Sequence, residues 1–336
     1  MSQKLNNIAV VGAGAWGTAL AQVFAGAERR VILYARDPGL AEAINKTGRN
    51  EIYLPSVALN RHIHATADLA ESVSGAGIIL LVTPTQFVRD LLIKLKPHLA
   101  PEMLLVNCAK GIEIASGKLL SEVAAELVPG YAYAVLSGPT FAGEVAKGLP
   151  TAVTLATAAP LQQAQDWAQA LSSKTFRPYL SPDVVGAEIA GAVKNVIAIA
   201  CGIVEGRGLG QNAKAAVMTR GMAEIKRLGL KKGATAESFL GLSGIGDLTL
   251  TCHSMSSRNY SLGFELGRGQ SIEVILASRR AVTEGITTAK AVADCAAKMD
   301  IDMPISVSVN NILHHGASVD DIVRELLSRH LKFESC

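Results

Sequence analysis

The sequence predicts an α/β protein in two parts, an N-terminal doubly wound sheet and a C-terminal all-α domain. Short apolar strands alternate with helical segments up to about residue 182, whereas strand patterns nearly vanish after Glu205. Alanine, valine, isoleucine and leucine are abundant, which suits buried parallel strands covered by helices. We place the domains at residues 1–182 and 183–336, and each is long enough to bury its own core.

Net charge and cysteine usage exclude several classes of protein. A formal charge of +3 gives no argument for a nucleic-acid partner. The five cysteines are odd in number and lack metal-ligand spacing, so no metal site is predicted. Cys108 and Cys201 lie in apolar runs and are interpreted as core thiols of a reducing compartment. No signal segment is recognised, and we expect a cytoplasmic protein without an integral membrane segment.

The first strand, Asn7 to Val11, leads directly into a glycine-rich turn and a helical run. In the motif G-A-G-A-W-G, Gly12 allows a tight turn and Gly14 lets the backbone approach a pyrophosphate. Gly17 lets the following helix pack closely on the strand. The N–H groups at the start of that helix suit phosphate oxygens. Strand, motif and helix together predict a Rossmann-type dinucleotide site.

The tip of the second strand bears on the choice of cofactor. That strand covers residues 30–35 and ends at Arg36 and Asp37. An acidic residue at the tip typically binds the ribose 2′-hydroxyl of NAD, whereas an arginine accommodates the 2′-phosphate of NADP. Because Arg36 stands at the tip, we expect NADP(H) to be preferred, without excluding NAD(H). The alternative is that Arg36 is a solvated loop charge.

Three more strands complete the predicted core of this half, each a short apolar run. They cover residues 77–83, 103–109 and 131–136, whereas residues 37–74 are interpreted as helical and irregular. A hairpin-like pair of strands, from Thr151 and from Thr175, flanks a helix and closes the domain near Pro182.

Two loops follow the carboxyl ends of these strands, where open α/β sheets bind their ligands. Lys110 comes directly after the strand at 103–109 and could reach a substrate oxyanion or a phosphate. The other reading of Lys110 is an ordinary loop charge. The segment S-G-P-T-F-A follows the strand at 131–136 and presents Gly138, Thr140 and Ala142 at the same edge.

The predicted helix from Glu188 to Glu205 is small or apolar throughout, apart from Lys194 and Asn195. A helix that is apolar on every side should be buried, and its polar pair argues against a membrane span. Burial lowers the pKa of an ammonium group, whereas a nearby carboxylate raises it, and both outcomes are open here. Lys194 is the leading catalytic candidate. The alternative is a lysine whose stem carries its charge out to water.

Two polar clusters follow in the helical half. Asp247 and Thr251 stand at i and i+4, and so share one face if the segment is helical. The stretch from Ser256 to Tyr260 combines hydroxyls, a guanidinium and an amide at a helix start, which suits an anion. Asp247 and Ser257 could instead be helix caps. Further helices are predicted from Ala213, Val282 and Val319.

Together these motifs resemble the bacterial NAD(P)-dependent glycerol-3-phosphate dehydrogenase family. They occur in the family's order from about Ile8 to His315: G-A-G-A-W-G-T-A, A-K-G-I-E, S-G-P-T-F-A, G-A-V-K-N-V-I-A-I-A, G-D-L-T-L-T-C, S-R-N and V-T-E-G. The resemblance implies interconversion of dihydroxyacetone phosphate and sn-glycerol 3-phosphate, chiefly by reduction for phospholipid synthesis. It also implies a homodimer.

The resemblance further implies roles for individual residues. Lys194 corresponds to the catalytic lysine, with Asn195, Asp247 and Lys110 assisting it. The implied substrate contacts are Lys110, Gly138, Thr140, Asp247, Ser257, Arg258 and Asn259, to which we add Lys194 and Thr251. The implied cofactor contacts are Ala15, Trp16, Arg36, Lys110, Ala142, Arg258, Val282 and Glu284, in addition to Gly12, Gly14 and Gly17 of the glycine motif.

Some residues depart from the family pattern. Ala15-Trp16 stands where relatives often have Ser-Tyr or Ser-Trp, and Arg36 replaces a histidine seen in some members. Two other functions compete with this interpretation. A 3-hydroxyacyl-CoA or 6-phosphogluconate type of dehydrogenase shares the architecture, although the former is expected to use a His–Glu pair where this helix has Lys-Asn. A cofactor-binding regulatory protein without turnover is the other alternative.

Overall fold

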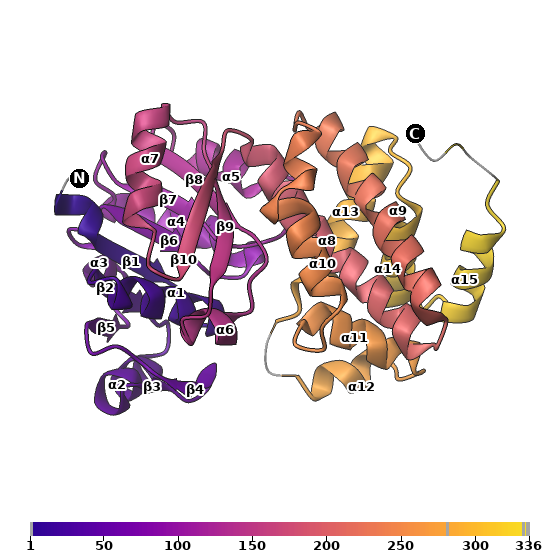
Figure 1. The fold of residues 1–336 in the computed structure, drawn as a ribbon, viewed down its shortest axis with the longest axis horizontal. Helices are drawn as coiled ribbons and strands as arrows, with labels where there is room; N and C mark the ends of the chain where they lie inside the picture. Colours follow the sequence, from indigo (N-terminus) through magenta and orange to yellow (C-terminus); the bar gives the residue numbers. More distant parts are fainter. Residues whose placement is uncertain (1–2, 280–281, 331–332, 334–336) are drawn as a thin grey trace.

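The computed structural model describes residues 3–279, 282–330 and 333. An eight-stranded sheet fills the N-terminal half, and a bundle of helices forms the other half (Figure 1). The strands run in the order β10-β9-β8-β7-β6-β1-β2-β5. Their bounds are β1 Asn7–Val11, β2 Arg30–Tyr34, β5 Ile63–Thr66, β6 Ile78–Leu81, β7 Leu104–Asn107, β8 Ala132–Ser137, β9 Thr151–Ala156 and β10 Phe176–Ser181. The predicted fold class is confirmed.

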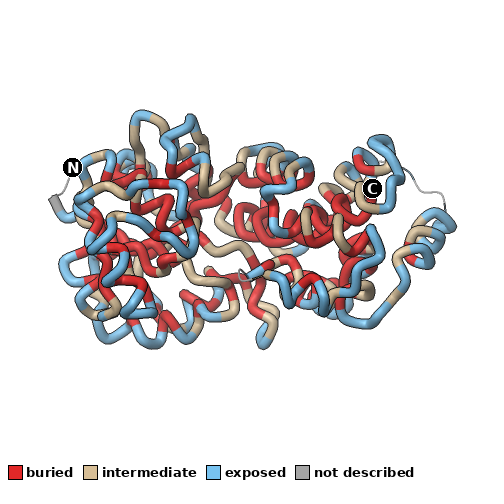
Figure 2. The backbone as a smooth tube through the Cα atoms, turned by 90° about the horizontal axis from the view of Figure 1, so that it is seen from below, coloured by how far each residue is buried: buried red, intermediate tan, exposed pale blue. Residues whose placement is uncertain are grey.

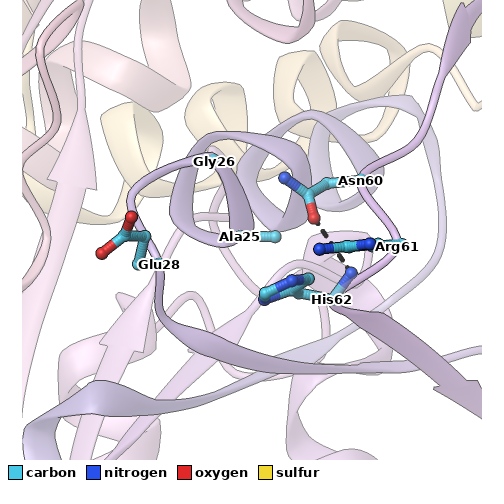
Figure 3. A pocket seen from close by; sticks show the side chains of 6 residues that line it. All are labelled: Ala25, Gly26, Glu28, Asn60, Arg61 and His62. Carbon is cyan, nitrogen blue, oxygen red and sulfur yellow. Dashed lines mark hydrogen bonds between the residues drawn. The ribbon is translucent and has the colours of Figure 1, made fainter.

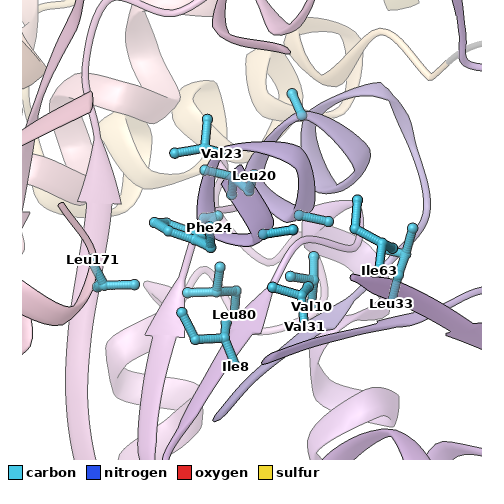
Figure 4. Packing of buried hydrophobic residues seen from close by; sticks show 14 of the residues in the cluster. Ile8, Val10, Leu20, Val23, Phe24, Val31, Leu33, Ile63, Leu80 and Leu171 are labelled. Atoms are coloured by element: carbon cyan, nitrogen blue, oxygen red, sulfur yellow. The ribbon is translucent and has the colours of Figure 1, made fainter. Parts of the chain in front are cut away.

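Helices cover both faces of the sheet because successive residues of the central strands point to opposite sides. Ile8 and Val10 of β1 pack under Leu20 and Phe24 on one face, as Figure 4 shows. Ala9 and Val11 face the other side, where α4 and α5 contribute to the core. The helices of this half are α1 Ala15–Gly26, α2 Pro38–Thr47, α3 Leu69–Val73, α4 Val88–Leu95, α5 Leu120–Leu127, α6 Ala142–Ala146 and α7 Leu161–Ala170.

The interpretation of residues 37–74 as helical and irregular was incomplete. This region holds α2 and α3, but it also holds β5 at the edge of the sheet. It further contains a small antiparallel hairpin, β3 Arg49–Asn50 with β4 Leu54–Ala58. These strands are short, and Pro55 interrupts β4, so they lack the apolar runs that revealed the central strands.

The prediction that the last two strands pair like a hairpin was wrong. β9 and β10 are parallel, whereas β8 and β9 are antiparallel. The helix between β9 and β10, α7, is the crossover connection that parallel neighbours require. A helix between two strands was therefore a sign of parallel pairing.

The helical half is built around α8, Val184–Gly206, whose residues from 186 to 204 are all buried (Figure 2). Among the described helices, α8 alone is long and apolar enough to span a membrane, but it lies wholly inside the protein as a core helix. The surrounding helices are α9 Gly210–Lys231, α10 Asp247–Cys252, α11 Arg258–Gly267, α12 Ile272–Ala277, α13 Glu284–Met299, α14 Pro304–His315 and α15 Val319–Leu327.

Glycines allow α8 and α11 to pack backbone against backbone. Each helix carries a G-x-x-x-G pair, Gly202 and Gly206 in α8 and Gly263 and Gly267 in α11. A Cβ atom on Gly263 would lie 2.0 Å from the carbonyl oxygen of Ile199. Since this contact is with backbone, it could be relieved only by separating the helices.

Replacing Gly263 by alanine should therefore destabilise the protein by about 2 kcal/mol, because overpacking outweighs the better helix propensity of alanine. Chemical denaturation of the variant would measure this loss. Gly26→Ala is the control, since a Cβ atom there meets nothing within 4 Å. Equal stability of the two variants would contradict the tight packing of α8 against α11.

Candidate functional site

The glycine loop between β1 and α1 has the geometry of an open phosphate-binding turn. Gly12 has a positive φ of 129°, which favours glycine, and Gly17 lies so close to it that a Cβ atom would stand 1.8 Å from the Gly12 oxygen. Gly14 occupies the N-cap position of α1, where a Cβ atom would meet nothing within 4 Å. The loop thus presents the free N–H groups of a helix N-terminus to open space.

Lys194 is buried, as the sequence predicts, and it is paired inside the protein. Its Nζ donates to Asp247 Oδ1 at 2.8 Å and to Thr251 Oγ1 at 2.7 Å, and its side chain is 9% exposed. Asp247 and Thr251 lie one turn apart on α10, which confirms that they share a helix face. The alternative of a lysine that extends out to water does not hold.

Lys110 reaches the same carboxylate from the sheet half. Its Nζ donates to Asp247 Oδ2 at 2.7 Å and to the Gly138 oxygen at 3.1 Å. The lysine stem passes Gly191 of α8, where a Cβ atom would lie 3.4 Å from Lys110 Cγ. Lys110 is therefore more than a loop charge, and Asp247 serves as a bridge between two lysines instead of a helix cap.

The charges in this cluster oppose the effects of burial. Burial lowers the pKa of Lys194 to about 8, against the opposing influence of Asp247. Burial also acts to raise the pKa of Asp247, but the positive charges of Lys110 and Lys194 outweigh it and hold that pKa below its usual value. At neutral pH the result is an ionised carboxylate beside an ammonium group that can give up its proton.

Asn195 belongs to a second set of contacts. Its Oδ1 accepts a hydrogen bond from Asn259 Nδ2 at 2.9 Å, and Asn259 Oδ1 accepts one from the Gly285 N–H at 2.9 Å. Ser257 is the N-cap of α11 and accepts from the Tyr260 N–H. The capping role considered for Ser257 is thus real, and it places the serine at the helix N-terminus beside Arg258 and Asn259.

Two residues near the start of α13, Val282 and Glu284, link the start of α11 to the sheet half. The guanidinium of Arg258 donates to the Val282 oxygen at 2.7 Å. Glu284 accepts hydrogen bonds from the N–H and hydroxyl of Thr85, just beyond β6. Burial raises the pKa of Glu284 above its ordinary value. These contacts bring α11 and the start of α13 to the carboxyl edge of the sheet.

The remaining candidates lie along that same edge of the sheet. Arg36 is exposed just beyond β2, and the Asp37 carboxylate caps α2 by accepting from the Gly39 N–H at 2.9 Å. Ala15 and Trp16 are the first residues of α1, and Ala142 is the first residue of α6. Thr140 donates to the Gly138 oxygen at 3.3 Å.

Glu188 is a buried charge that the sequence interpretation treated only as a helix boundary. Its carboxylate accepts hydrogen bonds from the Ser121 N–H at 3.0 Å, the Ser121 hydroxyl at 2.5 Å and the Tyr133 hydroxyl at 3.0 Å. Glu188 therefore ties α8 to α5 and β8, two turns before Lys194. Its place as a lone carboxylate in an otherwise small and apolar run was the available signal.

A surface hollow lies away from these residues (Figure 3). It is lined by the last residues of α1, by Glu28 and by Asn60, Arg61 and His62 ahead of β5. It sits at the amino ends of the strands, opposite the edge that bears the glycine loop, and contains none of the candidate residues. In the described part of the chain no cluster of His, Cys, Asp or Glu could hold a metal ion.

Comparison with known proteins identifies the family. The model for the N-terminus of NAD-dependent glycerol-3-phosphate dehydrogenase matches residues 7–163, and the model for its C-terminus matches residues 183–324. A glycerol-3-phosphate dehydrogenase (NAD(P)+) of Rhodospirillum rubrum is 53% identical over 99% of this chain and 95% of its own length. The chain belongs to the NAD(P)-dependent glycerol-3-phosphate dehydrogenases.

Other members agree with this assignment. The enzyme of Parvibaculum lavamentivorans is 51% identical over the full length of both chains. The crystal structure of glycerol-3-phosphate dehydrogenase from Coxiella burnetii superposes with a TM-score of 0.92 at 37% identity, covering 96% of this chain and 99% of that chain. As a glycerol-3-phosphate dehydrogenase, the protein is an oxidoreductase that uses NAD or NADP.

The burial of the Glu188 carboxyl group predicts that the stability of the protein depends on pH. Burial raises the pKa of Glu188 from 4.5 to about 7, so the folded protein binds this proton more tightly than the unfolded chain. Stability should therefore fall as pH rises from about 4.5 to 7, by on the order of 3 kcal/mol from this one group. Glu188→Gln should remove that part of the slope.

Denaturation curves at several pH values between 5 and 8, for wild type and Glu188→Gln, would measure the difference. Other titrating groups are common to both proteins, so only the difference reports on Glu188. Parallel stability curves would contradict the assigned pKa.

Proposed function

We propose that this protein reduces dihydroxyacetone phosphate to sn-glycerol 3-phosphate with a hydride from NADPH or, less efficiently, NADH. Lys194 is the general acid of this reaction, and the product supplies the glycerophospholipid backbone. The observation that carries the proposal is the Asp247 carboxylate, which holds one lysine from each half of the molecule. Relatives about 50% identical are named glycerol-3-phosphate dehydrogenase (NAD(P)+).

The reaction needs one hydride at C2 and one proton at the ketone oxygen. The bound nicotinamide supplies the hydride. Lys194 donates the proton from Nζ to the developing alkoxide, and a pKa of about 8 leaves it mostly protonated at neutral pH yet able to release that proton. Asp247 and Thr251 orient Nζ through their hydrogen bonds. The neutral amine left behind then recovers a proton from water.

Lys110 and Asn195 stabilise the negative charge that develops on the substrate oxygen. Lys110 is already held beside Lys194 by the shared carboxylate, so little reorganisation is needed when charge appears. Removing the carboxylate would leave two ammonium groups facing each other in a buried site, which is costly. Asp247 is thus required to hold the two lysines close together.

The phosphate of the substrate is bound at the start of α11. Arg258 supplies a positive charge there, and Ser257 and Asn259 supply polar groups beside the helix N-terminus. Gly138 and Thr140 are the proposed substrate contacts from the loop after β8. The Gly138 oxygen receives the Lys110 Nζ hydrogen bond, which fixes this loop next to the lysine pair.

Residues along the carboxyl edge of the sheet would hold the cofactor, and the N–H groups of the glycine loop would bind its pyrophosphate. A preference for NADP(H) is supported by Arg36, which is exposed at the end of β2, while the Asp37 carboxylate is occupied as a helix cap. The other proposed cofactor contacts surround the same edge: Gly12, Gly14, Ala15, Trp16, Gly17, Lys110, Ala142, Arg258, Val282 and Glu284.

The protein works as two domains, residues 1–182 for the cofactor and 183–336 for catalysis and substrate. The end of β10 at Ser181 and the start of α8 at Val184 support this division. A homodimer and a cytoplasmic location complete the proposal. The homodimer rests on the family resemblance, and the location rests on the free, buried thiols of Cys108 and Cys201.

Lys194→Met should abolish NADPH oxidation by dihydroxyacetone phosphate, with a loss in kcat of at least a hundred-fold, because it removes the proton donor held on Asp247 Oδ1, whereas Lys110 stays on Oδ2. Cofactor affinity should stay near that of the wild type. Absorbance of NADPH and cofactor titration would measure the two quantities. In the wild type, kcat for reduction should fall as pH rises through about 8, where Lys194 loses its proton.

Lys214→Met is the matched control. Lys214 is also a buried, ion-paired lysine on a neighbouring helix, but its partner is Glu205 instead of Asp247. The control should keep its turnover. Substantial kcat in Lys194→Met would rule out the lysine as the proton donor.

Arg36→Asp should shift the enzyme toward NADH, because it replaces a positive charge that can bind the 2′-phosphate by a carboxylate that repels it. The ratio of kcat/KM for NADPH to that for NADH should fall at least ten-fold. Steady-state assays with both cofactors test this, and an unaltered ratio would remove Arg36 from the cofactor site.

A further inference from the structure

Asn50 is a fully buried amide behind the glycine loop. It lies in β3 with 0% of its surface exposed. Its Nδ2 donates to the carbonyl oxygen of Ala13 at 3.0 Å and to Thr18 Oγ1 at 2.8 Å. Its Oδ1 accepts from the Tyr53 N–H at 3.2 Å, which closes the turn of its own hairpin. One amide group therefore joins the hairpin to both ends of the loop.

The contact with Ala13 determines where the next N–H group points. In a trans peptide the C=O and the N–H lie in one plane and point in opposite directions. Because the Ala13 oxygen is directed inward onto Asn50, the N–H of Gly14 is directed outward. Within the described part of the chain this N–H has no acceptor, and the space in front of Gly14 is open.

Thr18 strengthens the same arrangement from the first turn of α1. Its hydroxyl accepts from Asn50 and lies 3.5 Å from the Ala13 oxygen, to which it can donate. Asn50, Thr18 and the Ala13 carbonyl thus form a closed set of buried polar groups. Loss of the amide would leave the carbonyl of Ala13 buried with a poor partner, and rotation of this peptide would relieve that cost.

We propose that Asn50 is a positioning residue for the cofactor: it holds the Ala13 carbonyl inward so that the Gly14 N–H faces the pyrophosphate. The proposal rests on the assignment of the glycine loop as the cofactor site. An amide suits this task because its two N–H groups serve two acceptors at once. A carboxylate of the same shape would place a negative charge against the Ala13 oxygen.

The pyrophosphate is common to both cofactors, which gives the proposal a specific signature. Asn50→Ala should weaken the binding of NADPH and of NADH by the same factor, about ten-fold, as expected for one buried hydrogen bond lost from the site. KM for dihydroxyacetone phosphate and kcat at saturating cofactor should change by less than two-fold. Arg36→Asp, by contrast, should change the ratio of kcat/KM for NADPH to that for NADH.

Gln22→Ala is the matched control for a general loosening of the hairpin. Gln22 also joins α1 to the end of this hairpin, since its side chain accepts from the Asn60 N–H at 2.7 Å and donates to the Ala58 oxygen. It makes no contact with the Ala13 peptide. The control should lose stability but keep its dissociation constants for both cofactors. Equal weakening of cofactor binding in the two variants would overturn the proposal.

Gly14→Ala separates failure of this inference from failure of the site assignment. Gly14 has an extended backbone, and a Cβ atom there meets nothing, so the variant should fold normally and yet obstruct a bound pyrophosphate. Unchanged cofactor binding in Gly14→Ala would refute the cofactor site itself. Weak binding in Gly14→Ala together with normal binding in Asn50→Ala would refute only the role of Asn50.

A second variant covers the case in which Asn50→Ala does not fold. Thr18→Val keeps the shape of the buried side chain but removes the hydroxyl that Asn50 contacts. It should weaken the binding of both cofactors by about three-fold, as measured by isothermal titration calorimetry. Wild-type dissociation constants in Thr18→Val would then count against the proposal.

Discussion

The carboxylate of Asp247 is the group on which the arrangement of the candidate active site depends. It is 1% exposed and accepts hydrogen bonds from Lys110 and Lys194, one from each half of the molecule. Without such a partner the two ammonium groups would repel each other, and Lys194 would be a buried charge with no counter-ion. A buried ion pair of this kind contributes little net stability, but removal of one partner costs about 3–5 kcal/mol. The pair fixes the position of the proposed proton donor, Lys194, whose pKa burial lowers to about 8.

Helix α8 brings that carboxylate, the start of α11 and the sheet together. Glu188 ties it to α5 and β8, Gly191 leaves room for the stem of Lys110, and Lys194 follows one turn later. Further along, Gly202 and Gly206 allow α11 to lie against it, and α11 carries Arg258 and Asn259. Small residues in α8 therefore set its packing, since a side chain at Gly202 or Gly206 would displace the α11 backbone and one at Gly191 would press on Ser137 Oγ.

Much of the site could be anticipated from residues whose local pattern carries a physical meaning. The glycine spacing after β1, the lysine in an apolar helix and the i, i+4 relation of Asp247 and Thr251 are all local features, and the structure places them as expected. Asn50 has no such pattern, because a buried asparagine in a two-residue strand looks like any loop residue. The edge strand β5 and the parallel pairing of β9 with β10 were missed for a related reason. Strand partners are chosen by contacts that are distant in sequence.

By itself, the sequence determined the fold class, the dinucleotide loop, the helix that buries Lys194 and the resemblance to a family, because each depends on residues close together in the chain. Only the tertiary structure decided which charges meet. Lys110 lies 137 residues from Asp247, and Lys194 lies 53 residues from it. The sequence also could not decide whether burial or the charge of Asp247 has the larger effect on the pKa of Lys194. Desolvation depends on every helix packed around that lysine, and in this structure it lowers the pKa of Lys194 by more than Asp247 raises it.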